Sequence, residues 1–141
     1  MRLTLKNLVV AVDKVHTLEE PIYEFGAYQV LGQENRSIRP LFENRQYVGC
    51  DLRSGPGVDC QLDLHQIDLP DASVGTVIML DTLEHVKYFW KAMDEVHRIL
   101  KPGGLVVFTL LMHFPIHNYP SDYWRFTPDG FRVMCEKFDH S

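Results

Sequence analysis

Hydrophobic residues recur along the chain with two periods, and together they predict alternating helices and strands. Near the N-terminus apolar residues return every three or four positions, a helical spacing, at Leu5, Leu8, Val9, Val12 and Val15. Pro21 should end this helix. A second helical stripe covers residues 88–100 and should stop at residues 101–104, where a lysine precedes Pro and two Gly. A third helix should begin at Pro128, behind Thr127 as its N-cap.

Short apolar runs between these helices predict strands at residues 22–25, 46–50, 58–62, 76–80 and 105–111. Strands that alternate with helices form a parallel α/β sheet. We expect strand 22–25 to lie between strands 46–50 and 76–80, with strand 105–111 outside the latter. Only about seven residues join Cys50 to Val58, whereas a parallel crossover needs a dozen or more. The third strand should therefore be a stub that no helix precedes.

Acidic residues stand at the ends of successive predicted strands, at Glu24, Asp51, Asp63 and Asp81. In parallel α/β sheets, ligands bind past the carboxyl ends of the strands, where the strand order reverses. The sequence therefore predicts a ligand site that is lined by carboxylates.

Charge and composition restrict the partners. The net charge is −5, with acidic and basic residues mixed along the chain, so we expect no nucleic-acid partner, which would require a basic face. No apolar run approaches the ~20 residues that span a bilayer, so we expect no membrane association. The three cysteines show no CxxC spacing, which favours a reduced, cytoplasmic location. His113 and His117 have metal-ligand spacing only within a helix, which Pro115 opposes, so we expect no metal.

Several motifs resemble one known family. They are DTLEHV at residues 81–86, EVHRILKPGG at 95–104, a DLH…PDAS stretch at 63–73 and YPSDYWRFT at 119–127. Over roughly residues 21–138 the chain resembles the class I, Rossmann-like methyltransferases that use S-adenosylmethionine, especially the type 11 branch. The resemblance implies a three-layer α/β fold and S-adenosylmethionine as the cofactor.

The resemblance also implies roles for individual residues. The Asp51 carboxylate would bind both ribose hydroxyls in bidentate fashion, although it could instead cap the turn that follows. Asp63 would face the adenine amino group, and the Leu64 amide would address a ring nitrogen. The remaining cofactor contacts would come from the first motif and from the end of the strand at 76–80, namely Glu24, Gly26, Ala27, Leu80 and Asp81.

The first motif departs from the family pattern of acid-x-Gly-x-Gly-x-Gly. After Glu24 and Gly26, the second and third glycines are replaced by Tyr28 and Val30. Glycine allows the backbone to approach a ligand closely. Tyr28 would either fill this space or cover the cofactor by stacking. The departure favours an alternative function, a catalytically degenerate domain that serves as a binding or interaction module.

Methyl transfer needs alignment of the nucleophile in a dry site, and an oxygen nucleophile usually also needs a general base. His117 and Asp122 are the candidate catalytic residues, in a loop over residues 113–127 that we expect to move as a lid. Glu84 and His85 could also take part in catalysis. Alternatively, Glu84 could be a charge that stabilises a helix N-terminus, and His85 could be a half-buried helix residue. Aromatic residues of the loop could form a substrate wall or cover the sheet edge, namely Tyr119, Tyr123, Trp124 and Phe126.

The family fold has seven strands, and this sequence ends where the sixth should begin. We therefore expect residues 1–141 to form a single partial methyltransferase domain, with an N-terminal helix in residues 1–20, a core over 21–138 and a sheet that lacks the last two strands. The uncovered fifth strand could pair with a second copy in a homodimer. The predicted function is methyl transfer to a small or medium acceptor. A nicotinamide-dependent oxidoreductase fits less well, because the close glycine spacing for pyrophosphate is missing.

Overall fold

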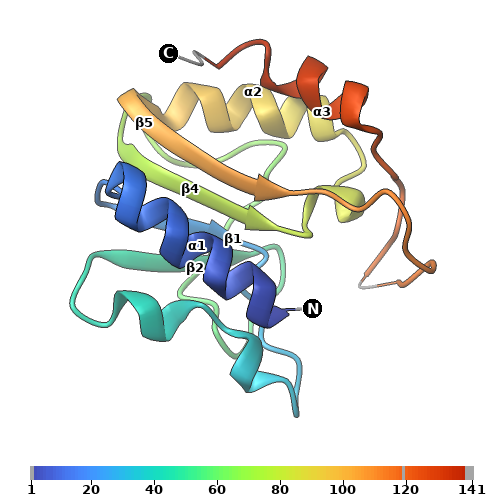
Figure 1. The fold of residues 1–141 in the computed structure, drawn as a ribbon, viewed down its shortest axis with the longest axis horizontal. Helices are drawn as coiled ribbons and strands as arrows, with labels where there is room; N and C mark the ends of the chain where they lie inside the picture. Colours follow the sequence, from blue (N-terminus) through green and yellow to red (C-terminus); the bar gives the residue numbers. More distant parts are fainter. Residues whose placement is uncertain (1, 119, 139–141) are drawn as a thin grey trace.

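The computed structural model describes residues 2–118 and 120–138 and arranges them as an α/β domain (Figure 1). The α-helices are α1 (Arg2–His16), α2 (Phe89–Ile99) and α3 (Pro128–Cys135). The 3₁₀ turns are η1 (Glu34–Arg36), η2 (Arg39–Phe42) and η3 (Leu83–His85). The strands are β1 (Ile22–Phe25), β2 (Tyr47–Asp51), β3 (Cys60–Gln61), β4 (Val74–Leu80) and β5 (Leu100–Thr109).

The strands form one 5-stranded sheet in the order β3-β2-β1-β4-β5, and every neighbouring pair is parallel. Glu24 in β1 is the partner of Gly49 in β2 and of Ile78 in β4. This order confirms the expected central position of β1 and the outer position of β5. The stub is confirmed as well, because β3 comprises only Cys60–Gln61.

Two apolar clusters lie on opposite faces of the sheet and make the domain three-layered, as the resemblance implies. On one face Val9 of α1 packs with Ile22 and Ile78. On the other face Met93 of α2 and Met134 of α3 pack with the sheet. Figure 1 shows α1 across the front of the sheet, with α2 and α3 together along its other side. Every residue of β4 is buried, as expected for a strand covered on both faces.

The first helix differs from the prediction in its end and in its buried face. α1 ends at His16 rather than at Pro21, because Thr17 adopts a left-handed conformation (φ 54) and the Leu18 amide donates to Asp13 Oδ1 at 2.8 Å. Leu18 is then buried against the sheet. Val15, in the last turn of the helix, stays 76% exposed, although the apolar spacing placed it on the buried face.

The last strand also begins earlier than expected. Residues 101–104 were predicted to separate the second helix from strand 105–111, but β5 follows α2 directly from Leu100. Leu100 pairs with Val74, and the register then shifts so that Leu105 pairs with Thr76. A bulge within the ladder therefore accommodates the Pro-Gly-Gly segment. At the third helix the prediction is confirmed, since Thr127 Oγ1 accepts from the Gly130 amide at 3.1 Å.

None of the helices in the described ranges is long and apolar enough to cross a membrane.

Candidate functional site

A pocket of about 480 Å³ opens past the carboxyl ends of β1, β2 and β4. A volume of this size is typical of small-molecule sites. Most of the predicted site residues lie in its wall: Gly26, Asp51, Asp63, Leu64, Leu80, Asp81 and His117. The sheet topology brings these residues together from segments that are distant in sequence, at the edge where the strand order reverses.

The loop after β1 requires its first glycine. Gly26 has a φ of 86°, which favours glycine, and a Cβ atom there would lie 2.6 Å from Thr82 Oγ1. The amides of Gly26 and Ala27 both donate to the Cys50 carbonyl, at 2.9 and 3.0 Å. The loop backbone is thereby fixed to the end of β2.

Tyr28 occupies the position of the family's second glycine and lies in the pocket wall. Its ring stacks under the Arg53 guanidinium, with 4.2 Å between the guanidinium carbon and the ring centroid. A Cβ atom on Gly55 would lie 2.5 Å from Tyr28 Cε2, so the ring packs closely on the loop after β2. Tyr28 therefore links the loop after β1 to the loop after β2 at the border of the pocket. The sequence suggested that Tyr28 would either fill the space of the missing glycine or stack over the cofactor; its ring instead packs on the second loop and on Arg53.

Asp51 ends β2 with its carboxylate facing the pocket. Its Oδ1 atom accepts from the Arg53 amide at 2.9 Å and from Arg53 Nε at 3.1 Å. In the described part of the chain Oδ2 receives no hydrogen bond. The carboxylate is thus oriented by one oxygen and can accept from a ligand with the other.

Asp63 and Leu64 form the neighbouring wall. Asp63 Oδ1 accepts from the His65 amide at 2.8 Å and lies 2.8 Å from His65 Nδ1. Burial opposes ionisation of Asp63, but these bonds outweigh it and lower the pKa of its carboxyl group. Leu64 is buried and provides an apolar surface beside this charge.

Asp81 follows β4 in a left-handed conformation, with φ 49. Its amide donates to Thr109 Oγ1 at 2.9 Å, and the Thr109 hydroxyl donates to Asp81 Oδ1 at 2.7 Å. Non-glycine residues in this conformation concentrate at functional sites. The reciprocal pair with β5 holds the Asp81 side chain against the pocket.

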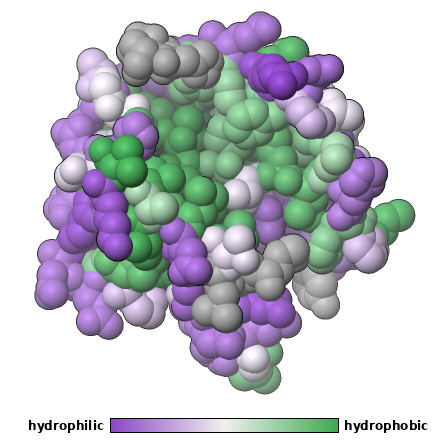
Figure 2. Space-filling model, viewed as in Figure 1, coloured by the Kyte–Doolittle hydropathy of each residue, from purple (hydrophilic) through white to green (hydrophobic). Residues whose placement is uncertain are grey.

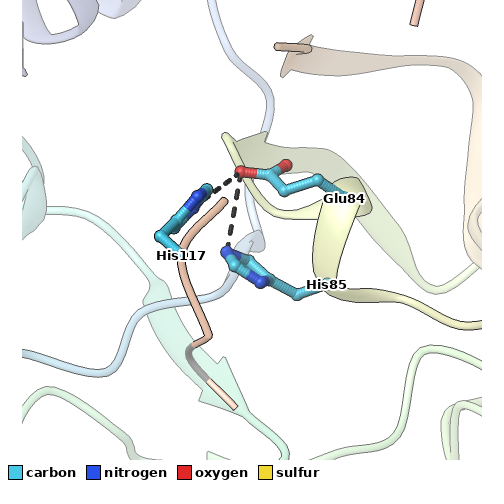
Figure 3. Close-up of side chains that lie close together, drawn as sticks. All are labelled: Glu84, His85 and His117. Carbon is cyan, nitrogen blue, oxygen red and sulfur yellow. Dashed lines mark ion pairs between the residues drawn. The ribbon is translucent and has the colours of Figure 1, made fainter. Parts of the chain in front are cut away.

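Glu84, His85 and His117 converge at the pocket (Figure 3). Glu84 is fully buried, and its carboxylate oxygens have no hydrogen-bond partner among the described residues. Burial and the nearby Asp81 carboxylate raise the pKa of Glu84 to about 7. Its Oε1 atom lies 3.6 Å from His85 Nε2 and 3.7 Å from His117 Nε2. Burial lowers the pKa of His85.

Asp122 does not line the pocket; it organises the loop that carries His117. Arg125 donates to both of its oxygens, at 2.6 and 2.8 Å, and the His117 amide donates to Oδ2 at 2.8 Å. The Arg125 guanidinium and these bonds hold the pKa of Asp122 well below its usual range. Asp122 is therefore a poor proton acceptor and a good support for His117.

Two other predicted cofactor residues, Glu24 and Ala27, also lie outside the pocket wall as far as the described residues define it. Alternation along β1 turns Glu24 toward the face covered by α1, where its carboxylate accepts from the Tyr47 hydroxyl. Ala27 is buried beneath the loop. The aromatic residues Trp124 and Phe126 pack on the core rather than on the pocket, and Tyr119 lies outside the described residues.

Sequence reasoning did not anticipate Arg53, Thr82 and Phe114, which also line the pocket. Thr82 is the second residue of the DTLEHV motif, directly after the strand-end acid Asp81, so its place in that motif was the available signal. Arg53 and Phe114 lie in irregular loops, where hydrophobic periodicity carries no information about side-chain direction.

A parallel sheet with a carboxylate-lined pocket at its switch point defines the class of α/β domains that bind nucleotide-like cofactors. Residues 35–108 match the methyltransferase domain family. The chain therefore belongs to this family, whose members use S-adenosylmethionine as their cofactor. Among curated proteins no significant match is found.

Solved structures share the fold. The [4+2]-cyclase SpnF superimposes with a TM-score of 0.67 at 13% identity, over 92% of this chain and 54% of its own. A candidate methyltransferase from Bacillus halodurans C-125 gives a TM-score of 0.68 at 14% identity, over 92% of this chain and 67% of its own. The trans-methyltransferase CalH, in complex with SAH, gives a TM-score of 0.55 at 17% identity, over 75% of this chain and 36% of its own. This chain thus spans only part of the length of the structures it matches.

Proposed function

We propose that this domain binds S-adenosylmethionine in the pocket and transfers its methyl group to a small or medium acceptor. One observation carries the proposal: the carboxylates of Asp51, Asp63 and Asp81 surround the pocket at the ends of parallel strands. A ligand with a sulfonium, an ammonium and ribose hydroxyls complements such a wall, because carboxylates accept charge-assisted hydrogen bonds. When bound, the cofactor supplies an activated methyl group.

In this proposal, one part of the pocket binds the cofactor and the other part binds the acceptor. Asp51 would hold the ribose hydroxyls through its Oδ2 atom, and Asp63 with Leu64 would hold the adenine. Gly26 gives backbone access to the middle of the pocket, and Leu80 with Asp81 would border the methyl group. His85 and His117 also line the pocket, and we place the acceptor beside them.

At the acceptor end, His117 is the predicted catalytic residue that reaches the pocket, and Asp122 acts on it as a positioning residue. The bond from the His117 amide to Asp122 fixes the loop backbone. Substituting either residue should lower turnover more than cofactor affinity, because neither contacts the proposed cofactor end.

A second function, a binding module that does not catalyse, is favoured by one observation. Tyr28 and Val30 replace glycines and both line the pocket. Their side chains narrow the space that the backbone would otherwise leave to the methionine portion of the cofactor.

Calorimetric titration with S-adenosylmethionine and with its demethylated product tests the proposal. We expect both to bind one site per chain. Asp51→Ala should weaken binding about tenfold to a hundredfold, because it removes hydrogen bonds worth roughly 1.5–3 kcal/mol each before compensation. Asp129→Ala is the control, since the Asp129 side chain is 91% exposed and outside the pocket.

Unchanged affinity in a folded Asp51→Ala variant would contradict the assignment of the ribose site. Absence of binding to either molecule in the unsubstituted chain would favour the non-catalytic module.

We also infer that β5 forms a contact with a second copy of the chain. β5 pairs only with β4 in the described sheet and leaves its other edge open. Residues along and just after this edge are half-buried and apolar, namely Leu105, Val106, Phe108 and Leu110. Figure 2 shows apolar side chains gathered across the middle of this view, with hydrophilic side chains around them.

A further inference from the structure

The cluster of Glu84, His85 and His117 has an arrangement that its own hydrogen bonds do not explain. Glu84 and His85 come from η3, and His117 comes from the loop after β5. One ligand atom from each residue lies within 4.8 Å of the others. Figure 3 shows the two imidazoles directed at the same carboxylate oxygen.

The outer nitrogens of both histidines face hydrogen-bond acceptors. His85 Nδ1 lies 2.5 Å from the Ser121 carbonyl. His117 Nδ1 lies 3.2 Å from the Pro115 carbonyl and 3.2 Å from Asp122 Oδ2. Because carbonyl and carboxylate oxygens only accept, each Nδ1 must carry a hydrogen. In the neutral rings, both Nε2 lone pairs therefore point toward Glu84.

Two imidazole lone pairs and the ionised form of the buried Glu84 carboxylate would repel one another without a proton or a metal cation between them. Hydrogen bonds do not resolve this, because 3.6 and 3.7 Å exceed the usual 2.7–3.2 Å range. Glu84 is fully buried, and both of its oxygens are unpaired within the described ranges. A buried charge of this kind is normally paired or coordinates a metal.

We propose that Glu84, His85 and His117 bind one divalent transition-metal ion through a carboxylate oxygen and two Nε2 atoms. Two histidines and one carboxylate are the ligand set of catalytic zinc and of non-haem iron(II) sites. With metal–ligand bonds of about 2.0–2.1 Å, tetrahedral ligand atoms lie about 3.4 Å apart. The two separations from Glu84 Oε1 need to close by only a few tenths of an ångström, and the two histidine ligand atoms lie within 4.8 Å of each other.

The surroundings match what a metal site requires beyond its ligands. Metal-binding histidines usually donate their other ring hydrogen to a carbonyl or a carboxylate, which fixes the ring orientation. Both histidines do so here, and Arg125 in turn holds Asp122, the carboxylate beside His117. His85 and His117 also line the pocket, so the open coordination position would face it.

This inference departs from the expectation that the chain holds no metal. That expectation considered the spacing of His113 and His117 along one segment. The proposed site instead joins two adjacent residues in η3 to a single histidine from a loop about thirty residues later, a combination that only the fold creates.

Metal binding can be tested without cofactor or acceptor, so its outcome is independent of the proposed methyl transfer. The full chain, stripped with a chelator, is titrated with Zn²⁺ by calorimetry and with Co²⁺ by visible absorption. We expect one ion per chain, intense d–d bands from a tetrahedral Co²⁺ site and a higher melting temperature with Zn²⁺.

Glu84→Gln, His85→Ala and His117→Ala should each weaken Zn²⁺ binding at least tenfold and reduce the Co²⁺ bands. His113→Ala is the matched control, because His113 is exposed in the same loop and outside the cluster. Circular dichroism checks that each variant folds, and His117→Gln provides a second variant if His117→Ala does not. No binding by the unsubstituted chain, or equal loss of affinity in His113→Ala, would overturn the proposal.

Discussion

Single residues at the strand ends are held in place by bonds within the protein. Asp51 is oriented by Arg53, Asp63 by His65 and Asp81 by Thr109. Ordering these side chains in advance reduces the entropy lost when a ligand binds. The sheet topology brings these acids, which are separated in the sequence, to the wall of one pocket.

Gly26→Ala should destabilise the domain more than Gly32→Ala does. Both glycines have positive φ, but a Cβ atom would meet Thr82 Oγ1 at 2.6 Å in the first and has nothing within 4 Å in the second. We expect a loss of about 1 kcal/mol at Gly32, from conformation alone, and about 2–4 kcal/mol at Gly26. Urea unfolding measures both. Equal losses would show that contact with Thr82 contributes nothing.

Thiol reactivity should separate two cysteines that face each other across β2 and β3. Cys50 is fully buried, and burial raises the pKa of its thiol to about 12, whereas Cys60 is exposed. Only the thiolate reacts, so at pH 8 Cys50 should stay protonated and unmodified. We expect Cys60→Ser to abolish the fast phase of labelling by a disulfide reagent, because the half-buried Cys135, whose thiol pKa is also raised by burial, should react more slowly. Persistence of that phase in Cys60→Ser and its loss in Cys50→Ser would contradict the burial of Cys50.

At the scale of elements, one arginine of α2 anchors the segment that leads to β4. Arg98 donates to the carbonyls of Ile67 and Leu69 at 2.7 and 2.8 Å. It also pairs with Glu95, whose carboxylate accepts from the Ile67 amide at 2.7 Å. This network explains the Glu-x-x-Arg part of the EVHRILKPGG motif as a structural feature rather than a catalytic one.

Arg98 also donates to Asp71 Oδ1 at 2.8 Å. Arg98→Ala should therefore lower the free energy of unfolding by about 1–3 kcal/mol, because it removes the Arg98 donor from two carbonyls and from the carboxylates of Glu95 and Asp71. Arg132→Ala serves as the control, since Arg132 forms an exposed ion pair with Asp129. Such pairs contribute little, so we expect a change within about 0.5 kcal/mol. Chemical denaturation compares the two, and similar losses would show that the Arg98 network is not stabilising.

At the scale of the whole molecule, residues 113–118 and 120–127 close one side of the pocket. The Tyr123 amide donates to the Glu84 carbonyl at 2.7 Å, and Trp124 Nε1 donates to the Val86 carbonyl at 3.0 Å. The second half of the loop is thus tied to η3 and to the segment after it. Phe114 and His117, in the first half, reach the pocket. Movement of this loop as a lid stays a prediction.

The open edge of β5 leads to a prediction about assembly. Exposed strand edges pair readily with other chains unless charge, proline or covering elements prevent it. We expect light scattering to give twice the monomer mass at micromolar concentration, with dissociation on dilution. A monomer mass throughout the concentration series would contradict pairing through β5.

Hydrophobic periodicity alone determined the order and type of the main elements, because each apolar stripe must be buried. The stub at β3 and the cap at Thr127 follow from spacing and turn chemistry, and the central position of β1 was expected from the alternation of strands and helices and from the acids at the strand ends. Periodicity could not locate the end of α1, because a hydrogen bond from the Leu18 amide to the Asp13 side chain ends that helix. It could not locate the start of β5 either, because residues 101–104 form a bulge within the strand ladder.

The candidate site was likewise predicted in part from the sequence and decided in part by the tertiary structure. The sequence determined which acids stand at strand ends, so Asp51, Asp63 and Asp81 were predicted in the pocket and lie there. It could not show that Glu24 turns to the other face of the sheet or that Arg125 neutralises Asp122. Only the tertiary structure brought His117 next to Glu84 and His85. His117 lies in an irregular loop far along the chain from η3, and hydrophobic periodicity does not show where such a loop packs.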